Sequence, residues 1–127
     1  MQNQIIIQEQ SQFEQRTLEI ESRLCGKWQN LSTNQLWLFS PIQQHDRYGQ
    51  LFLYGNNETE PLKFDYEVMW VQEGLIFLNL LRETIVLIEQ YQICFEDVNT
   101  VKLSRQIRSS ESPCELTVLQ RRSFEDS

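Results

Sequence analysis

The chain has 127 residues, of which 40% are hydrophobic and 23% charged, a composition typical of one globular domain that buries roughly two-thirds of its surface on folding. The net charge of -7 repels phosphate groups, so the sequence argues against binding to nucleic acid or to an anionic membrane. Seven Phe, four Tyr and three Trp with no Ala favour strands over a helical bundle, because aromatic side chains fit a pleated sheet.

A leader rich in Gln and Glu occupies residues 1–23. Phe13, Ile20 and Leu24 lie at i, i+7 and i+11, and this spacing predicts a narrow amphipathic helix that starts near Ser11. Its apolar stripe is too thin to support a domain of its own. We therefore expect the helix to lie either on the rest of the domain as a lid or against a second copy of the chain.

Gly26 is placed to end this helix, and short runs of apolar and β-branched residues follow it, separated by turn residues. The predicted strands cover residues 28–34, 35–39, 50–54, 63–70, 75–81, 85–95, 100–104 and 115–121. Alternation of polar and apolar residues from Lys63 to Val68 makes the strand over residues 63–70 the clearest. Residues 78–90 also fit a helical spacing, so helix stays open there, although the branched residues favour a strand.

This succession predicts a mainly β fold, a single up-and-down antiparallel β-barrel of about eight short strands over residues 24–122, followed by a frayed tail over residues 123–127. Closure of the barrel also removes the exposed sheet edges that would promote aggregation.

The cysteines Cys25, Cys94 and Cys114 contain no C-x-x-C spacing and one of them must stay unpaired, which favours reduced thiols in a cytoplasmic protein. The first residues have no basic region followed by a long apolar run, so we expect no signal peptide. Uncharged apolar runs are also far shorter than the ~20 residues that a membrane span needs.

Catalytic and metal-binding patterns are weak throughout. A catalytic triad or a histidine-based metal site needs a histidine, and the single one, His45, lies in a polar loop where we expect it to be exposed to solvent. The four glycines are isolated turn residues and form no phosphate-binding loop. We therefore expect no metal and no cofactor, and a protein that is not an enzyme.

Aromatic and branched residues on the alternating strands are the candidates for lining the barrel interior. The predicted lining consists of Phe64, Tyr66, Val68, Trp70, Phe77, Tyr91, Ile93 and Phe95. They either pack as a filled core or surround a cavity, since eight short strands enclose room for side chains or for one small ligand. The hydroxyl groups of Tyr66 and Tyr91 need partners inside a dry core, which favours a cavity in which they orient a ligand.

Gly26-Lys27-Trp28 at the first strand and Leu119-Gln120-Arg121-Arg122 at the end of the last strand resemble the calycin superfamily, the lipocalins and their short bacterial relatives. The resemblance implies that an arginine of the last strand, either Arg121 or Arg122, lies across the Trp28 indole and closes one end of the barrel, next to Gly26. A guanidinium stacked on an indole gains a cation–π contact worth ~1 kcal/mol or more when desolvated.

The function we expect first is non-catalytic binding of a small hydrophobic or chromophore-like ligand. The alternative is a barrel with a filled core that associates with a protein partner, or with a second copy as a homodimer, through the N-terminal helix or an exposed region around Trp37. A third hypothesis is an enzyme resembling the calycin-fold bilin lyases.

Overall fold

A computed structural model of the chain describes residues 14–43, 46–55, 60–72, 74–105 and 115–122. One helix, residues 14–24, precedes eight strands. The strands are β1 (Gly26–Asn30), β2 (Leu36–Phe39), β3 (Gly49–Tyr54), β4 (Leu62–Gln72), β5 (Leu75–Arg82), β6 (Val86–Asp97), β7 (Thr100–Arg105) and β8 (Glu115–Arg122). The helix start predicted near Ser11, its residue Phe13 and the tail over residues 123–127 lie outside the described residues.

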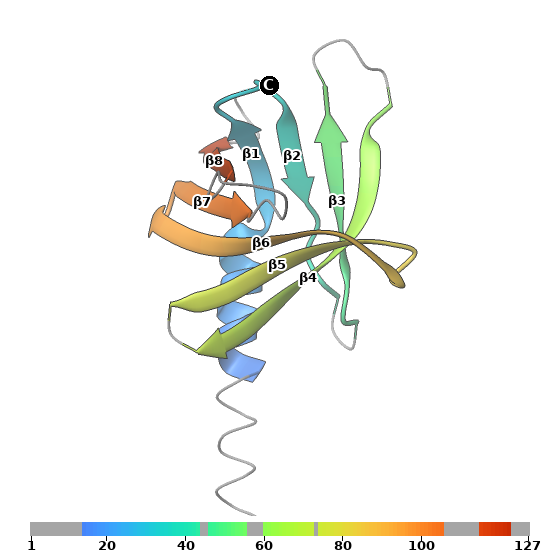
Figure 1. Ribbon diagram of the computed structural model, residues 1–127, viewed down its shortest axis with the longest axis vertical. Coiled ribbons are helices and arrows are strands. Elements are labelled where there is room, and N and C mark those ends of the chain that lie inside the picture. Colours follow the sequence, from blue (N-terminus) through green and yellow to red (C-terminus); the bar gives the residue numbers. More distant parts are fainter. Residues whose placement is uncertain (1–13, 44–45, 56–59, 73, 106–114, 123–127) are drawn as a thin grey trace, which may run out of the picture.

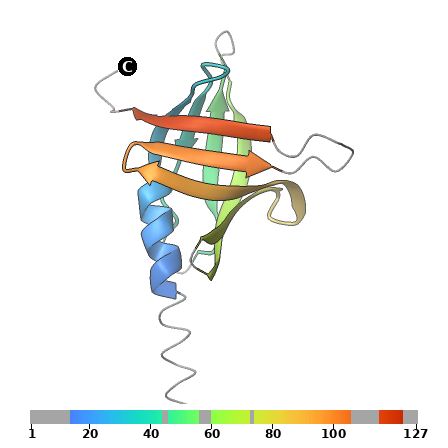
Figure 2. The same ribbon diagram turned by 60° about the vertical axis from the view of Figure 1, so that its left-hand side comes forward.

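The eight strands form one closed antiparallel barrel in which each strand pairs with its neighbours in the sequence, and β8 closes the ring by pairing with β1. Figure 2 shows β7 and β8 crossing in front of β1, β2 and β3, which form the far wall. This confirms the predicted mainly β fold. Within the described residues no helix is long and apolar enough to cross a membrane.

The segment that also fitted a helix forms two paired strands, β5 and β6. The turn between them places Glu83 and Thr84 at φ values of 56° and 58°, the left-handed conformation that turns the chain back on itself. The Asp65 carboxylate accepts a hydrogen bond from the Thr84 backbone N–H at 3.1 Å and holds this turn.

The first strand ends at Asn30, earlier than predicted, because residues 30–34 form a turn in which Asn34 has a φ of 61°.

Alternation along the strands sends one set of side chains into the barrel. The buried core is made by Ile20, Leu24, Trp28, Trp37, Phe39, Leu51, Leu53, Tyr66, Val68, Leu78, Leu80, Ile93, Val101, Leu103 and Leu119. Ile20 and Leu24 come from the helix, so the helix packs on the barrel interior as the lid arrangement requires.

Two ends of the barrel can be distinguished from this topology. The helix leads directly into β1, and Figures 1 and 2 show it below the strand β1 that it joins. We call this the helix end, where β1 and β7 begin and β2 and β8 finish. The opposite end, where β1 finishes and β4, β6 and β8 begin, is called the distal end.

Candidate ligand site in the barrel interior

Trp28 and Arg121 form a latch at the helix end. The Arg121 guanidinium carbon lies 4.2 Å from the centroid of the Trp28 ring, and the indole Nε1 donates a hydrogen bond to the Leu24 carbonyl at 2.7 Å. Trp28 and Leu24 are both fully buried. The register pairs Trp28 directly with Arg121, so their side chains share the inner face of neighbouring strands.

The guanidinium of Arg121 also joins three parts of the backbone. It donates to the carbonyls of Cys25 (3.0 Å), Val98 (3.2 Å) and Arg23, which lie before β1 and after β6. Burial lowers the pKa of Arg121. Arg122 points to the outer face instead, where it donates to the Gln29 side chain. Of the two arginines that the sequence left open, Arg121 therefore lies on the indole.

Gly26 makes room for this arrangement. Its φ is +121°, a conformation that side chains rarely adopt, and a Cβ atom there would lie 3.1 Å from Arg121 Nη1. The helix is held on the barrel by a second cation–π contact, in which the Arg23 guanidinium carbon lies 4.1 Å from the Phe95 ring centroid. The helix end is thus closed by apolar packing, stacked cations and carbonyl hydrogen bonds together.

Tyr66 fills the interior near the helix end. Its ring meets Phe39 edge to face at 5.1 Å between centroids, and its hydroxyl donates a hydrogen bond to the Ser40 carbonyl. Desolvation is the main reason that its pKa is raised well above the ordinary value for tyrosine. The hydroxyl is thus already hydrogen-bonded inside the protein, and a role of Tyr66 in orienting a ligand stays a prediction.

Inward-facing side chains at the distal end remain accessible to solvent. Leu62 pairs with the buried Leu53 yet is 54% exposed, and Phe64 and Tyr91 are only partly buried. Trp37 lies beneath them, 6.3 Å from the Tyr91 ring in an edge-to-face contact. Trp37 is 4% exposed, which corrects the expectation of an exposed surface around it: the inner face of β2 carries this residue.

A partly exposed charged cluster lies at the rim of the same end. Arg105 forms ion pairs with Glu89 and Glu115, and its pKa is raised by its hydrogen bonds to both carboxylates. Desolvation, with a smaller effect of Glu89, raises the pKa of Tyr91, while Arg105 acts in the opposite direction. Tyr91 therefore keeps its proton at neutral pH and can donate a hydrogen bond beside the cluster.

Sequence reasoning missed the Glu89–Arg105–Glu115 cluster. The available signal was alternation: Glu89 lies two residues before Tyr91, and Arg105 two residues after the core residue Leu103. Antiparallel pairing of the ends of β7 and β8 then places Glu115 directly opposite Arg105.

Seven of the eight predicted lining residues come together around the interior. Tyr66, Val68 and Ile93 belong to the buried core, and Phe64, Trp70, Tyr91 and Phe95 pack against it while partly buried. Phe77 is the exception, because it pairs with Met69 and Gln92 and alternates with the buried Leu78, which places it on the outer face.

Among the described residues, no group of three His, Cys, Asp or Glu side chains could hold a metal ion. Cys25 is a half-buried free thiol whose pKa is raised by desolvation, with Arg121 acting in the opposite direction. Cys94 is free and exposed, and Cys114 and His45 lie outside the described residues.

Comparison with known proteins gave no match to a family model, a curated protein or a solved structure. What the molecule shows is a closed eight-stranded antiparallel barrel, closed by a helix at one end and with accessible inward-facing residues at the other.

Proposed function

We propose that the protein is a calycin-like barrel that binds a small hydrophobic molecule through its distal end. The observation that carries the proposal is the difference between the two ends. At the helix end, Leu24 and Trp28 are fully buried beneath the latch, whereas at the distal end the inward-facing Leu62, Phe64 and Tyr91 reach solvent. A ligand that enters the interior does so from the distal end.

The calycin assignment rests on two features taken together. The strands form a closed eight-stranded antiparallel barrel, and a first-strand tryptophan lies beneath a last-strand arginine, as in the superfamily that the sequence resembles. Neither feature identifies a ligand. They supply the scaffold on which the distal site is built.

The chemistry of the distal end selects the class of ligand. Phe64, Tyr91 and Leu62 offer apolar and aromatic surface, above the buried ring of Trp37. The Tyr91 hydroxyl beside Arg105 offers a polar contact that would orient one end of the molecule. Because Tyr66 and its neighbours occupy the interior near the helix end, the ligand is small and occupies only the distal part of the barrel.

Titration with the neutral, environment-sensitive dye Nile red tests the proposal. We expect saturable binding with one dye per chain, and a Kd raised about fivefold or more by Phe64→Ala, because one aromatic wall is removed. Phe52→Ala is the matched control, since Phe52 is similarly half-buried but lies on the outer face of the adjacent strand. Its Kd should stay within about twofold of the unsubstituted protein.

Absence of saturable binding, or equal weakening by Phe64→Ala and Phe52→Ala, would exclude the distal site. Native mass spectrometry of the purified protein gives an independent measurement. A bound small molecule should be lost on Tyr91→Trp, which fills the site, and retained in Tyr54→Trp, at an exposed tyrosine at the end of β3.

A further inference from the structure

Three side chains at the distal rim indicate which charge the ligand's head group carries. Arg105 donates from Nη1 to Glu89 Oε1 and from Nη2 to Glu115 Oε2, so one guanidinium serves two carboxylates. All three side chains are accessible in part, with 31% of Arg105, 31% of Glu89 and 49% of Glu115 exposed. We call them the rim cluster. Its two carboxylates and one guanidinium give it a formal charge of -1.

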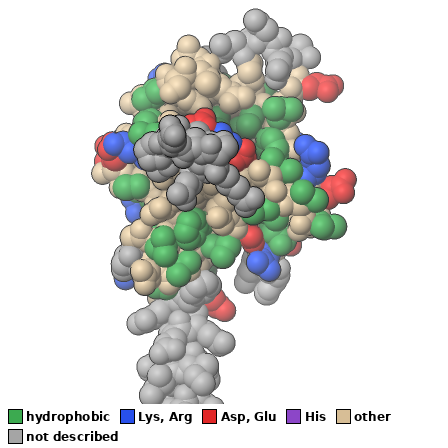
Figure 3. Space-filling model, viewed as in Figure 1, with side chains coloured by type: hydrophobic (Ala, Val, Ile, Leu, Met, Phe, Trp, Pro, Cys, Tyr) green, Lys and Arg blue, Asp and Glu red, His purple; other side chains and the backbone are tan. Residues whose placement is uncertain are grey.

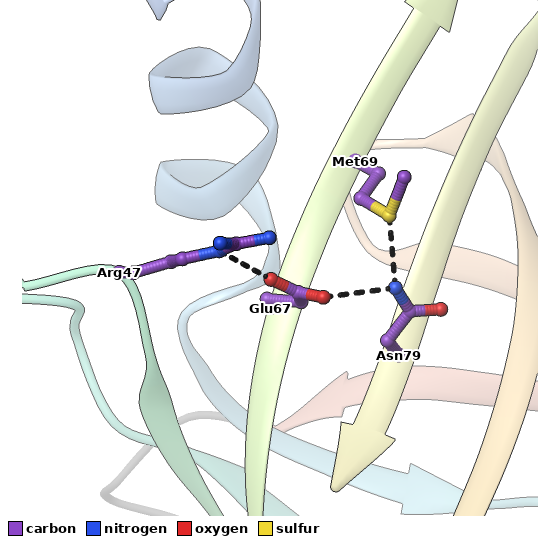
Figure 4. Close-up of polar contacts among 4 residues, drawn as sticks. All are labelled: Arg47, Glu67, Met69 and Asn79. Carbon is purple, nitrogen blue, oxygen red and sulfur yellow. Dashed lines mark hydrogen bonds and ion pairs between the residues drawn. The ribbon is translucent and has the colours of Figure 1, made fainter. Parts of the chain in front are cut away.

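The Glu67 carboxylate, on the outer face of β4, shows a contrasting arrangement. One oxygen of Glu67 accepts from Arg47 Nε at 2.8 Å, and the other accepts from Asn79 Nδ2 at 3.1 Å (Figure 4). Glu67 is also only 8% exposed. This carboxylate is therefore bonded through both oxygens and hidden from a ligand.

The carboxylates of the rim cluster are engaged through one oxygen each. Glu89 uses Oε1 and Glu115 uses Oε2, and no further hydrogen bond reaches either carboxylate from the described part of the chain. The Tyr91 hydroxyl, close enough for both carboxylates to influence its pKa, likewise forms no hydrogen bond with another described residue. Carboxylate oxygens accept hydrogen bonds, and a neutral hydroxyl accepts as well as donates. The rim thus offers mainly acceptors to a ligand.

The segments around the rim cluster carry an excess of negative charge as well. Acidic and basic side chains lie close together among apolar ones on the face drawn in Figure 3, so the net charge of -7 does not by itself give the charge of the distal end. The strand ends and connections at this end fall within residues 30–36, 54–63, 82–86 and 105–115. Together with Glu89, the sequence of these segments contains the acidic residues Glu58, Glu60, Glu83, Glu111 and Glu115 and the basic residues Lys63, Arg82, Arg105 and Arg108. Six acidic against four basic residues leave a balance of -2, of the same sign as the rim cluster.

We propose that the ligand of the distal site is a cationic amphiphile, an apolar or aromatic body that carries an ammonium group. This inference rests on the proposed function and adds the charge of the ligand to it. The apolar body packs on Phe64 and Tyr91, and the ammonium group donates to the open oxygens of Glu89 and Glu115 and to the Tyr91 hydroxyl. Hydrogen bonds between an ammonium and a carboxylate are charge-assisted and stronger than neutral ones.

An anionic head group fits the same place poorly. Arg105 is the cation of the rim cluster, and the chain's own carboxylates already occupy two of its N–H groups. A ligand carboxylate would have to displace Glu89 or Glu115 from the guanidinium and would then lie beside both negative charges. A neutral alcohol avoids this repulsion but gains no charge-assisted bond.

Displacement of Nile red by three naphthalenes of similar size tests the charge preference at pH 7. The competitors are 1-naphthylmethylammonium, 1-naphthylmethanol and 1-naphthylacetate, which differ in the charge of the head group. In buffer of low ionic strength the ammonium compound should bind at least about tenfold more tightly than the acetate, with the alcohol between them. Added salt should narrow this difference and leave the Kd of the alcohol within about twofold.

Glu115→Gln removes one negative charge from the rim cluster and keeps the shape of the side chain. The preference for the ammonium compound over the alcohol should fall at least about fivefold, while the Kd of the alcohol stays within about twofold. Glu96→Gln is the matched control: it changes the net charge of the chain equally, and Glu96 is 45% exposed and paired with Lys102 towards the helix end of β6. Its preference should stay within about twofold of the unsubstituted protein. If circular dichroism shows that Glu115→Gln is unfolded, Glu89→Gln is measured with the same expectation.

The outcomes separate this inference from the proposed function. Equal affinities for the three compounds, tightest binding of the acetate, or no displacement by the ammonium compound would overturn the cationic ligand while the Nile red site stands. Equal effects of Glu115→Gln and Glu96→Gln would also overturn it, because the preference would then come from the charge of the whole chain. If Nile red itself does not bind, the proposed function and this inference both fail.

Discussion

Removal of the Arg121 guanidinium is the most direct test of the latch. Arg121→Met keeps most of the aliphatic stem over Trp28 and removes the cation and its donors. Three backbone carbonyls then lose a partner, those of Cys25, Val98 and Arg23. The cation–π contact contributes about 1 kcal/mol. The part-buried bond to Cys25 adds about 1.5 kcal/mol, because a charged donor is lost, while the carbonyls of Val98 and Arg23 are more exposed and can turn to water.

The expected loss is therefore about 2–3 kcal/mol in the free energy of unfolding, measured by urea denaturation with tryptophan fluorescence. In a domain of this size it corresponds to a fall in Tm of about 8–12 °C. Arg122→Met is the control, because Arg122 is an exposed neighbour on the outer face that contacts only the Gln29 side chain in the bonds described, and its removal should cost less than about 1 kcal/mol. A loss below about 1 kcal/mol for Arg121→Met, or equal losses for both variants, would refute the latch.

Other substitutions test the packing around this end of the barrel. Trp28→Ala removes a fully buried indole and should destabilise the protein by about 3–5 kcal/mol in the same assay; a loss below about 1 kcal/mol would contradict the burial of the ring. Gly49→Ala should cost about 1–3 kcal/mol, because the new Cβ would lie 2.5 Å from the Tyr66 ring, and an unchanged Tm would show that the ring moves aside freely. Desolvation raises the pKa of Glu21, so the folded state binds this proton more tightly than the unfolded state, and the stability that this provides is lost as pH rises through the raised pKa. Glu21→Gln should thus stabilise the protein at pH 7 relative to pH 4 and flatten that part of the pH profile, whereas Glu19→Gln on an exposed part of the helix should not; equal pH profiles for the two would reject the assignment.

The strand pattern could be predicted because alternation and turn residues are local signals. Residues 63–68 show this most clearly, since their polar and apolar residues alternate in the sequence and lie on opposite faces of β4. The choice between Arg121 and Arg122 could not be made in this way. It depends on the register between β1 and β8, the first and last strands of the barrel, and a shift of one residue would exchange the two side chains.

The face on which Phe77 lies and the burial of Glu67 could not be predicted from the sequence pattern, for physical reasons. Phe77 lies in a run that is apolar on both faces, so alternation cannot say which face looks inward, and only its pairing with Met69 settles it. Glu67 occupies the polar face of the clearest strand, where the pattern predicts exposure to solvent. It is buried because Arg47 from a distant loop and Asn79 from the next strand bond both of its oxygens, and neither contact is local in the sequence.

The same strands carry stabilising contacts at one end and the proposed binding surface at the other. Trp28 and Arg121 tie together the helix, the start of β1 and the end of β8, so these contacts stabilise the barrel at the end opposite the proposed site. Phe64 and Tyr91 lie partly exposed at the distal end, away from these contacts. It follows that Arg121→Met should lower Tm while leaving the Nile red Kd of the folded protein within about twofold, and that Phe64→Ala should change the Kd far more than Arg121→Met does. A latch variant that weakens the dye as strongly as Phe64→Ala would show that the two ends are coupled through the interior.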